Sequence, residues 1–174
     1  FVYVLDRSRS MGFHQGQPLR AAKSELVASL NDLHTVHQFQ IIFYNERPSV
    51  LNPFRPRPPR ILFATEQNKG LAGDSVQALV PAGGTNHEAA IRLALGMQPD
   101  VIFLLTDADE PPLTASEMEG IRKRNAATAI HVVEFGSGPF AGRNDFLARL
   151  AKQNNGQYLY IDVSDVNALK TADR

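Results

Sequence analysis

The sequence contains no cysteine among its 174 residues. This absence excludes disulfide bonds and thiolate metal sites, and it leaves the cellular compartment open. Net charge is absent as well, because 18 Lys and Arg balance 18 Asp and Glu. A general binder of nucleic acid or of acidic membranes would carry a basic excess, so neither class is expected. No apolar run approaches the ~18 residues that cross a bilayer, so we expect no direct membrane contact by this domain.

The chain also lacks a basic segment before its first apolar run, FVYVL, and no signal peptide is recognisable. The length suits one domain with a substantial core. A natural chain rarely opens inside a core strand. We therefore expect residues 1–174 to be a single domain excised from a longer multidomain protein, with its localisation signals elsewhere.

Apolar runs of strand length alternate with segments of helical period. Most of the runs are continuous rather than alternating, as in strands that are covered on both faces. This order predicts an α/β fold, a doubly wound and mostly parallel sheet with helices on both faces. The expected strands are 1–5, 39–44, 101–105, 129–135 and 158–161, and the expected helices are 18–34, 89–97, 114–126 and one opened by Asn144 or Asp145, with a weaker one in 68–80.

Residues 52–60, NPFRPRPPR, are rich in proline and arginine. Prolines cannot join a sheet ladder, which favours a stiff exposed loop. The second interpretation is a proline-rich ligand for another domain. Residues 61–65 after it are expected to form a short edge strand.

Side chains with oxygen atoms lie at three places where an expected strand ends or an expected helix begins. Asp6, Ser8 and Ser10 follow the first strand, and Thr106, Asp107 and Asp109 follow the strand at 101–105. Thr85 follows two glycines in PAGGTNHE, just before a helix. Ligands of open α/β sheets bind beyond the carboxyl ends of the strands. Hard oxygen donors of this kind suit Mg²⁺, with Mn²⁺ or Ca²⁺ as alternatives.

Each of these segments has a structural interpretation when it is taken alone. Asp6 and Ser8 could satisfy loop amides, and Asp107 could be a strand-end turn residue. Thr85 has Glu88 three residues on, so it could be only the N-cap of the next helix. The three segments together, each at an element boundary, favour a shared metal ion.

These residues resemble the metal-ion-dependent adhesion site of the von Willebrand factor type A family. That site reads D-x-S-x-S, then a threonine after glycines, then an aspartate in a T-D pair. The matching residues here are Asp6, Ser8, Ser10, Thr85 and Asp107. The resemblance covers nearly the whole chain, to the start of a last helix near 165–172. It implies a six-stranded Rossmann-like sheet with one short antiparallel edge strand, which we assign to 61–65.

The resemblance also implies how the metal would be held. Ser8 and Ser10 would bind it directly, and Thr85, Asp6 and Asp107 would bind directly or through water. One position would stay open for a Glu or Asp of a partner protein. Family members commonly have glycine where this chain has Arg9, and Arg7 adds a second cation. Either arginine could weaken metal binding or hold an acidic partner, but pointing to solvent is the simpler expectation.

No further acids follow the second serine, where Met11 to His14 stand, so no adjacent second metal site is expected. Asp109 and Glu110 could support the site or be solvated turn residues. The sequence has no G-x-x-x-x-G-K-[ST] loop and no G-x-S-x-G elbow, so an enzyme is not expected.

The function that the resemblance implies is a metal-dependent, adhesion-type protein-binding module, monomeric in isolation. The alternatives are a subunit of an intracellular ATPase- or chelatase-linked assembly and, less favoured, a metal-dependent hydrolase. The cell surface or the periplasm is slightly favoured over the cytoplasm.

Overall fold

A computed structural model describes residues 1–108, 111–140, 142 and 145–165 of the chain. The strands are β1 (Val2–Asp6), β2 (Gln38–Tyr44), β3 (Ser49–Val50), β4 (Leu62–Phe63), β5 (Val101–Thr106), β6 (Ala129–Gly136) and β7 (Tyr158–Asp162). The helices are α1 (Phe13–Asn31), α2 (Glu66–Gln77), α3 (His87–Leu95), α4 (Ala115–Arg124) and α5 (Asp145–Gln153), with 3-10 turns η1 (Ser10–Gly12) and η2 (Val163–Asp165).

The strands form one mixed sheet in the order β3-β2-β1-β5-β6-β7. The five longer strands pair in parallel, and both two-residue strands run antiparallel to β2. The predicted fold class is therefore confirmed, including the antiparallel edge. That edge is divided into two pieces: β4, inside the expected 61–65, pairs with the start of β2, and β3 pairs with its end.

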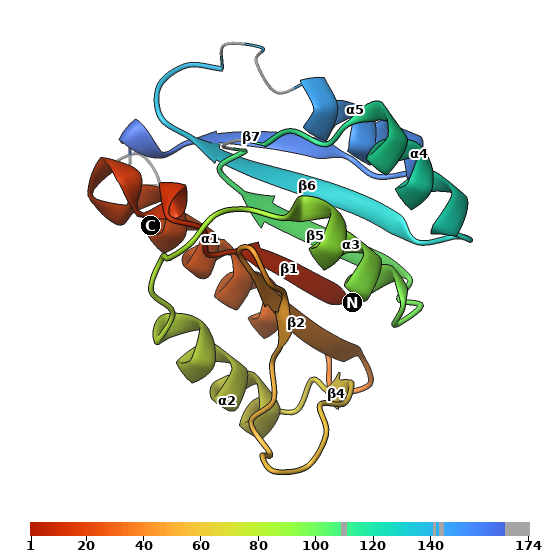
Figure 1. Cartoon of the computed structure of the whole chain (residues 1–174). Helices are drawn as coiled ribbons and strands as arrows, with labels where there is room; N and C mark the ends of the chain where they lie inside the picture. The colour runs from red at the N-terminus through yellow and green to blue at the C-terminus, as the bar shows by residue number, and fades with distance from the viewer. Residues whose placement is uncertain (109–110, 141, 143–144, 166–174) are drawn as a thin grey trace.

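Helices cover both faces of the sheet (Figure 1). Helices α1 and α2 pack on one face, against Tyr3, Leu5 and Ile41. Helices α3, α4 and α5 pack on the other, against Val4, Ile102 and Val132. Every residue of β1 is buried, which explains the unbroken apolar sequence from Val2 to Leu5.

The observed helices begin and end at recognisable signals. The Thr65 side chain caps the N-terminus of α2. Helix α4 begins with a capping box, in which the Thr114 hydroxyl accepts from the Glu117 amide and the Glu117 carboxylate accepts from the Thr114 amide. Helix α1 is irregular at its start, where residues 14–16 have positive φ angles, and it ends at Asn31 rather than at residue 34. The Asn144 cap and the last helix at 165–172 lie outside the fully described residues. Within the described part of the chain, no helix combines the length and apolarity needed to cross a membrane.

Candidate metal centre

The candidate site lies at the carboxyl end of β1, where Asp6 is fully buried. The strand register places Asp6 beside Tyr44 of β2, and Thr106 follows Leu105, the last residue of β5 that pairs with β1. The Thr106 hydroxyl donates to Asp6 Oδ2 at 2.7 Å, and the Ser8 amide donates to Asp6 Oδ1 at 2.8 Å. Both oxygens of this buried carboxylate are thus hydrogen-bonded, as burial of a charge requires.

Two serines of the loop after β1 continue from Asp6 toward the loop after β5. Ser8 Oγ lies 3.0 Å from Ser10 Oγ, and Ser10 Oγ donates to Asp107 Oδ1 at 3.0 Å. Both serines are buried, and Asp107 is half-buried. Residues 97 positions apart in the sequence therefore share one hydrogen-bonded oxygen chain. This part of the predicted ligand set is brought together as the strand-end rule expects.

The loop that carries Thr85 is joined to the same end of the sheet by backbone hydrogen bonds. The Arg9 amide donates to the Gly83 carbonyl at 3.0 Å, and the Ala82 amide donates to the Arg7 carbonyl at 2.8 Å. Gly83 has a φ of 79°, a conformation that favours glycine. The glycine pair before Thr85 thus lets this loop run against the serine loop.

The N-cap of α3 is Asn86 and not Thr85. Asn86 Oδ1 accepts from the Ala89 amide at 3.0 Å. The capping interpretation of Thr85 is therefore wrong, and its half-buried side chain is left for another role. Thr85 lines a pocket of about 270 Å³ with Asn86, His87, Glu88, residues 111–114 and Glu117.

A buried polar group that sequence reasoning missed lies behind Asp6. The Tyr44 hydroxyl and His87 Nδ1 are 2.9 Å apart, and both residues are buried. Burial, and then the nearby Asp6 carboxylate, raise the pKa of the Tyr44 phenol well above its ordinary value. The tyrosine therefore stays neutral and can act as a hydrogen-bond donor or acceptor. The only available signal was its position at the end of an expected strand.

Asn45 and Glu46, directly after β2, form a fourth strand-end loop that the sequence reasoning did not examine. Asn45 Nδ2 donates to the Ala82 carbonyl at 2.8 Å, and Glu46 Oε1 accepts from the Gly84 amide at 3.0 Å. These two side chains therefore hold the Thr85 loop from the side of β2.

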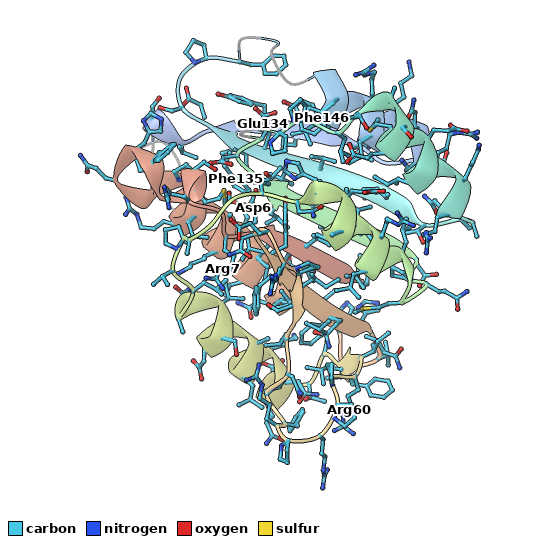
Figure 2. All side chains as sticks on the ribbon, viewed as in Figure 1. Asp6, Arg7, Arg60, Glu134, Phe135 and Phe146 are labelled. Carbon is cyan, nitrogen blue, oxygen red and sulfur yellow. The ribbon has the colours of Figure 1, made fainter. Side chains whose placement is uncertain are left out.

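The two arginines of DRSRS have different surroundings. Arg9 is exposed, as expected. Arg7 is half-buried, and its Nε is enclosed without a hydrogen-bond partner among the described residues, so it does not simply point to solvent. Side chains alternate along a strand, and Tyr3 and Leu5 face α1 and α2. Continuation of this alternation puts Arg7 on the α1/α2 side, opposite to Asp6 (Figure 2).

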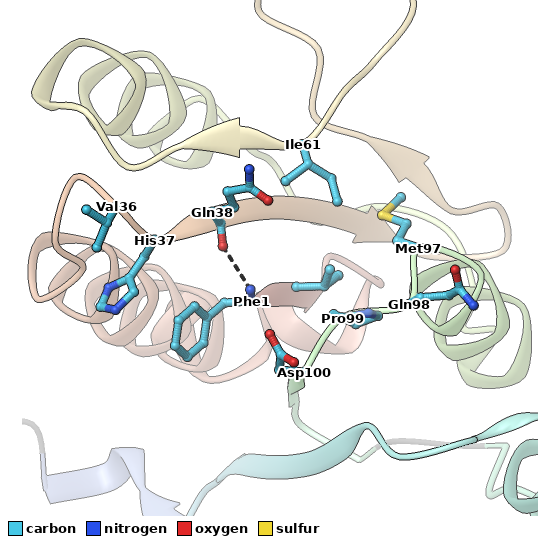
Figure 3. A pocket seen from close by; sticks show the side chains of 10 residues that line it. Phe1, Val36, His37, Gln38, Ile61, Met97, Gln98, Pro99 and Asp100 are labelled. Carbon is cyan, nitrogen blue, oxygen red and sulfur yellow. Dashed lines mark hydrogen bonds between the residues drawn. The ribbon is translucent and has the colours of Figure 1, made fainter.

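Among the described acids and pockets, none adds a ligand to this site. Asp109 and Glu110 lie outside the described residues. Within the described ranges, no cluster of three or more His, Asp or Glu side chains is placed to hold a metal. A pocket of about 280 Å³ at the other end of the strands, bordered by His37, Gln38 and Asp100, contains one carboxylate (Figure 3).

The donor set at Asp6 fits a hard divalent cation. Adjacent ligands of an octahedral Mg²⁺ with bonds of about 2.0–2.1 Å lie about 2.9 Å apart. The distances from Ser8 Oγ to Ser10 Oγ and from Ser10 Oγ to Asp107 Oδ1 are both 3.0 Å. This is also the length of a hydrogen bond, so the same oxygens can satisfy one another or share a cation with little movement.

Comparison with protein families gives one match, to the von Willebrand factor type A domain, over residues 1–110. No curated protein matches the sequence. Among solved structures, a von Willebrand factor type A protein from Catenulispora acidiphila is 20% identical with a TM-score of 0.78. The match covers 98% of this chain but only 41% of that one.

Two further solved structures share the fold. An aerotolerance-related membrane protein from Bacteroides fragilis is 20% identical, with a TM-score of 0.67 over 98% of this chain and 94% of that one. Proximal thread matrix protein 1 from the mussel byssus, with a zinc-occupied MIDAS motif, is 15% identical. Its TM-score is 0.62 over 97% of this chain and 46% of that one.

Proposed function

Since the chain belongs to the von Willebrand factor type A family, we propose that it is a divalent-metal-dependent protein-binding module. The observation that carries this proposal is the oxygen chain formed by Ser8, Ser10 and Asp107 at the carboxyl end of the sheet. The residues that would hold the metal are Asp6, Ser8, Ser10, Thr85 and Asp107.

Magnesium is the cation that we propose for this site. Mg²⁺ keeps several waters and uses few carboxylates, which suits this hydroxyl-rich set, and its ligand spacing of about 2.9 Å is close to the two observed separations. The zinc-occupied motif of the mussel protein supports a divalent ion at this position of the fold.

The two aspartates would differ in role. Asp6 is fully buried, and both of its oxygens already accept hydrogen bonds, so it would mainly hold Ser8 and Thr106 in place. Asp107 contacts Ser10 directly and is half-buried, which makes it the better direct ligand. The Tyr44 hydroxyl, which contacts His87 Nδ1, is a further buried polar group close to Asp6.

The partner that we propose supplies a Glu or Asp side chain. When bound, the cation would be surrounded mainly by neutral hydroxyls, so its charge would attract a carboxylate from outside. Arg9 is exposed between the two serines and adds positive charge on the same side. The pocket beside Thr85 would accept the side chain next to the partner's acid.

Binding is proposed in preference to catalysis because His87, the first residue of α3, is 2% exposed and its Nδ1 lies 2.9 Å from the Tyr44 hydroxyl. A serine nucleophile would need such a base within hydrogen-bond reach. The monomeric state, the origin of the chain in a longer protein and its extracytoplasmic location stay predictions.

A displayed library of random peptides tests the proposal. We expect peptides retained in Mg²⁺ and eluted by EDTA to share an Asp or Glu, and we expect Ser8→Ala to abolish their retention. Replacement of the shared acid by its amide should also abolish retention. Peptides retained equally in EDTA, or without a common acid, would refute the proposed mode of binding.

A further inference from the structure

The loop from Asn52 to Arg60 carries three arginines, and the proposed function does not use this positive charge. Residues 55–60 are all exposed, and three of them are arginines. Within the described residues, none of these arginines belongs to an ion pair. The loop projects from the β2 edge of the sheet, at the opposite edge from β7 (Figures 1 and 2).

Arg57, Pro58 and Pro59 have little conformational freedom. A proline ring fixes φ near −65°, and a residue before proline is restricted to extended or polyproline II geometry. Extended or polyproline II geometry is therefore favoured at Pro58, after the bend of the chain at Arg57. In one turn of a polyproline II helix, which has three residues, Arg57 and Arg60 would lie on one edge, about 9 Å apart.

Side chains from the body of the loop and from β2 hold both ends of this segment. Asn52 Nδ2 donates to the Arg57 carbonyl at 2.6 Å, and Gln40 Nε2 donates to the Arg60 carbonyl at 2.6 Å. Gln40 is 1% exposed, so the second anchor belongs to the core of the domain. The Arg60 guanidinium lies over the Phe54 ring, 5.1 Å from its centroid. The segment is thus presented in one conformation and would lose little entropy on binding.

We propose that Arg57–Arg60 is a docking segment for a partner protein domain with an aromatic groove bordered by carboxylates. Polyproline II segments bind such grooves because their preformed proline rings pack on aromatic side chains. The planar guanidinium of each arginine can pair with a carboxylate through two hydrogen bonds. Ile61 and Val36 are 42% and 78% exposed and line one pocket beside the end of the segment, which extends the surface with apolar contacts (Figure 3).

A protein partner is favoured over nucleic acid or an anionic membrane. Binding of polyanions depends on the number of positive charges and does not need prolines or a fixed spacing. The whole chain has zero net charge, and the charge here lies on one stiff segment with two anchored ends. A protein groove that recognises shape as well as charge would use the prolines, the arginines and the fixed conformation of this segment.

The test measures binding of the domain to a panel of purified SH3 and WW domains whose grooves carry acidic specificity pockets. We expect micromolar binding by at least one of them, weakened about tenfold or more by R57A/R60A. The matched control is Arg55→Ala, which removes an exposed arginine of the same loop outside the segment. It should change the affinity less than about twofold and leave the melting curve unchanged. R57A/R60A should lower the Tm by no more than about 4 °C, because the exposed contact of Arg60 with Phe54 is lost.

Binding in EDTA should equal binding in Mg²⁺, which separates this surface from the proposed metal site. The inference is overturned if no domain of the panel binds, or if R55A weakens binding as much as R57A/R60A. It is also overturned if a single-stranded oligonucleotide or phosphatidylserine vesicles bind more tightly than every panel domain, because the loop would then be a general anion-binding surface.

Discussion

Replacement of Ser10 by alanine separates the metal-binding role of the site from its contribution to the fold. Ser10 Oγ contacts both Ser8 Oγ and Asp107 Oδ1 at 3.0 Å. Without metal, the variant loses these two hydrogen bonds but leaves Asp107 partly accessible to water. We therefore expect a loss of about 1–2 kcal/mol in the free energy of unfolding.

The loss of Mg²⁺-dependent stabilisation is the larger effect, and it is seen only as a smaller rise in Tm when Mg²⁺ is added. A ligand present at about 100 times its Kd stabilises the native state by about 2.7 kcal/mol. For a domain of this size that is a rise in Tm of about 5–11 °C. If loss of a ligand weakens metal binding about a hundredfold, the same Mg²⁺ concentration adds only about 0.4 kcal/mol, or about 1–2 °C.

Thermal unfolding followed by circular dichroism, with and without Mg²⁺, measures both effects. Ser29→Ala is the matched control, because Ser29 Oγ bonds the Tyr3 hydroxyl at 2.8 Å on the α1 side of the sheet. This control should lower the Tm without metal and keep the full rise in Mg²⁺. A Ser10→Ala variant that kept the full rise would refute the assignment of Ser10 as a ligand.

Five further variants test the site and the fold. Asp6→Asn should remove the rise in Tm with Mg²⁺, whereas Asp6→Ala should also cost about 2–5 kcal/mol in denaturant unfolding, because two buried donors lose their acceptor. Gly156→Ala should lower stability by about 3 kcal/mol or more, since a Cβ there would overlap the Ile130 carbonyl of β6. A Cβ at Gly70 meets nothing within 4 Å, so Gly70→Ala should stabilise α2 by about 0.5–1 kcal/mol. The Thr114 hydroxyl, through its hydrogen bond, lowers the pKa of Glu117 below its ordinary 4.5. The capping box therefore stabilises the fold above that pH and loses its effect as pH falls through the lowered pKa, so Glu117→Gln should flatten the dependence of Tm on pH below about 5.

The parallel strands could be predicted because each contains a mainly apolar run of strand length, and β1 and β2 are buried on both faces, whereas β7 is only partly buried. The divided edge could not be predicted in full. Ser49–Val50 is only two residues long, and its pairing with β2 depends on the turn at residues 45–48 rather than on an apolar pattern. The start of α1 was missed for a similar reason, because positive φ angles at residues 14–16 leave no compositional signal.

The candidate ligands could be located because strand ends of a parallel sheet meet at one edge. The contacts beneath them required the strand register. Tyr44 appears in the sequence as the last apolar residue of a strand, and His87 appears as the second residue after a threonine. Only pairing of Asp6 with Tyr44 across the sheet, and the packing of α3 over it, brings the phenol and the imidazole together. The choice of Asn86 over Thr85 as N-cap likewise depends on loop geometry that adjacent residues do not specify.

The two proposed binding surfaces meet opposite ends of β2, and this strand holds both in place. At its carboxyl end, Asn45 fixes the loop that carries Thr85. Nearer its amino end, Gln40 fixes the carbonyl of Arg60. These two anchors are five positions apart along extended chain, about 16 Å, which is beyond the range of about 7–10 Å over which substitutions usually couple. Occupation of one surface should therefore leave the affinity of the other unchanged, and the domain could join a metal-bound acidic partner to a second protein.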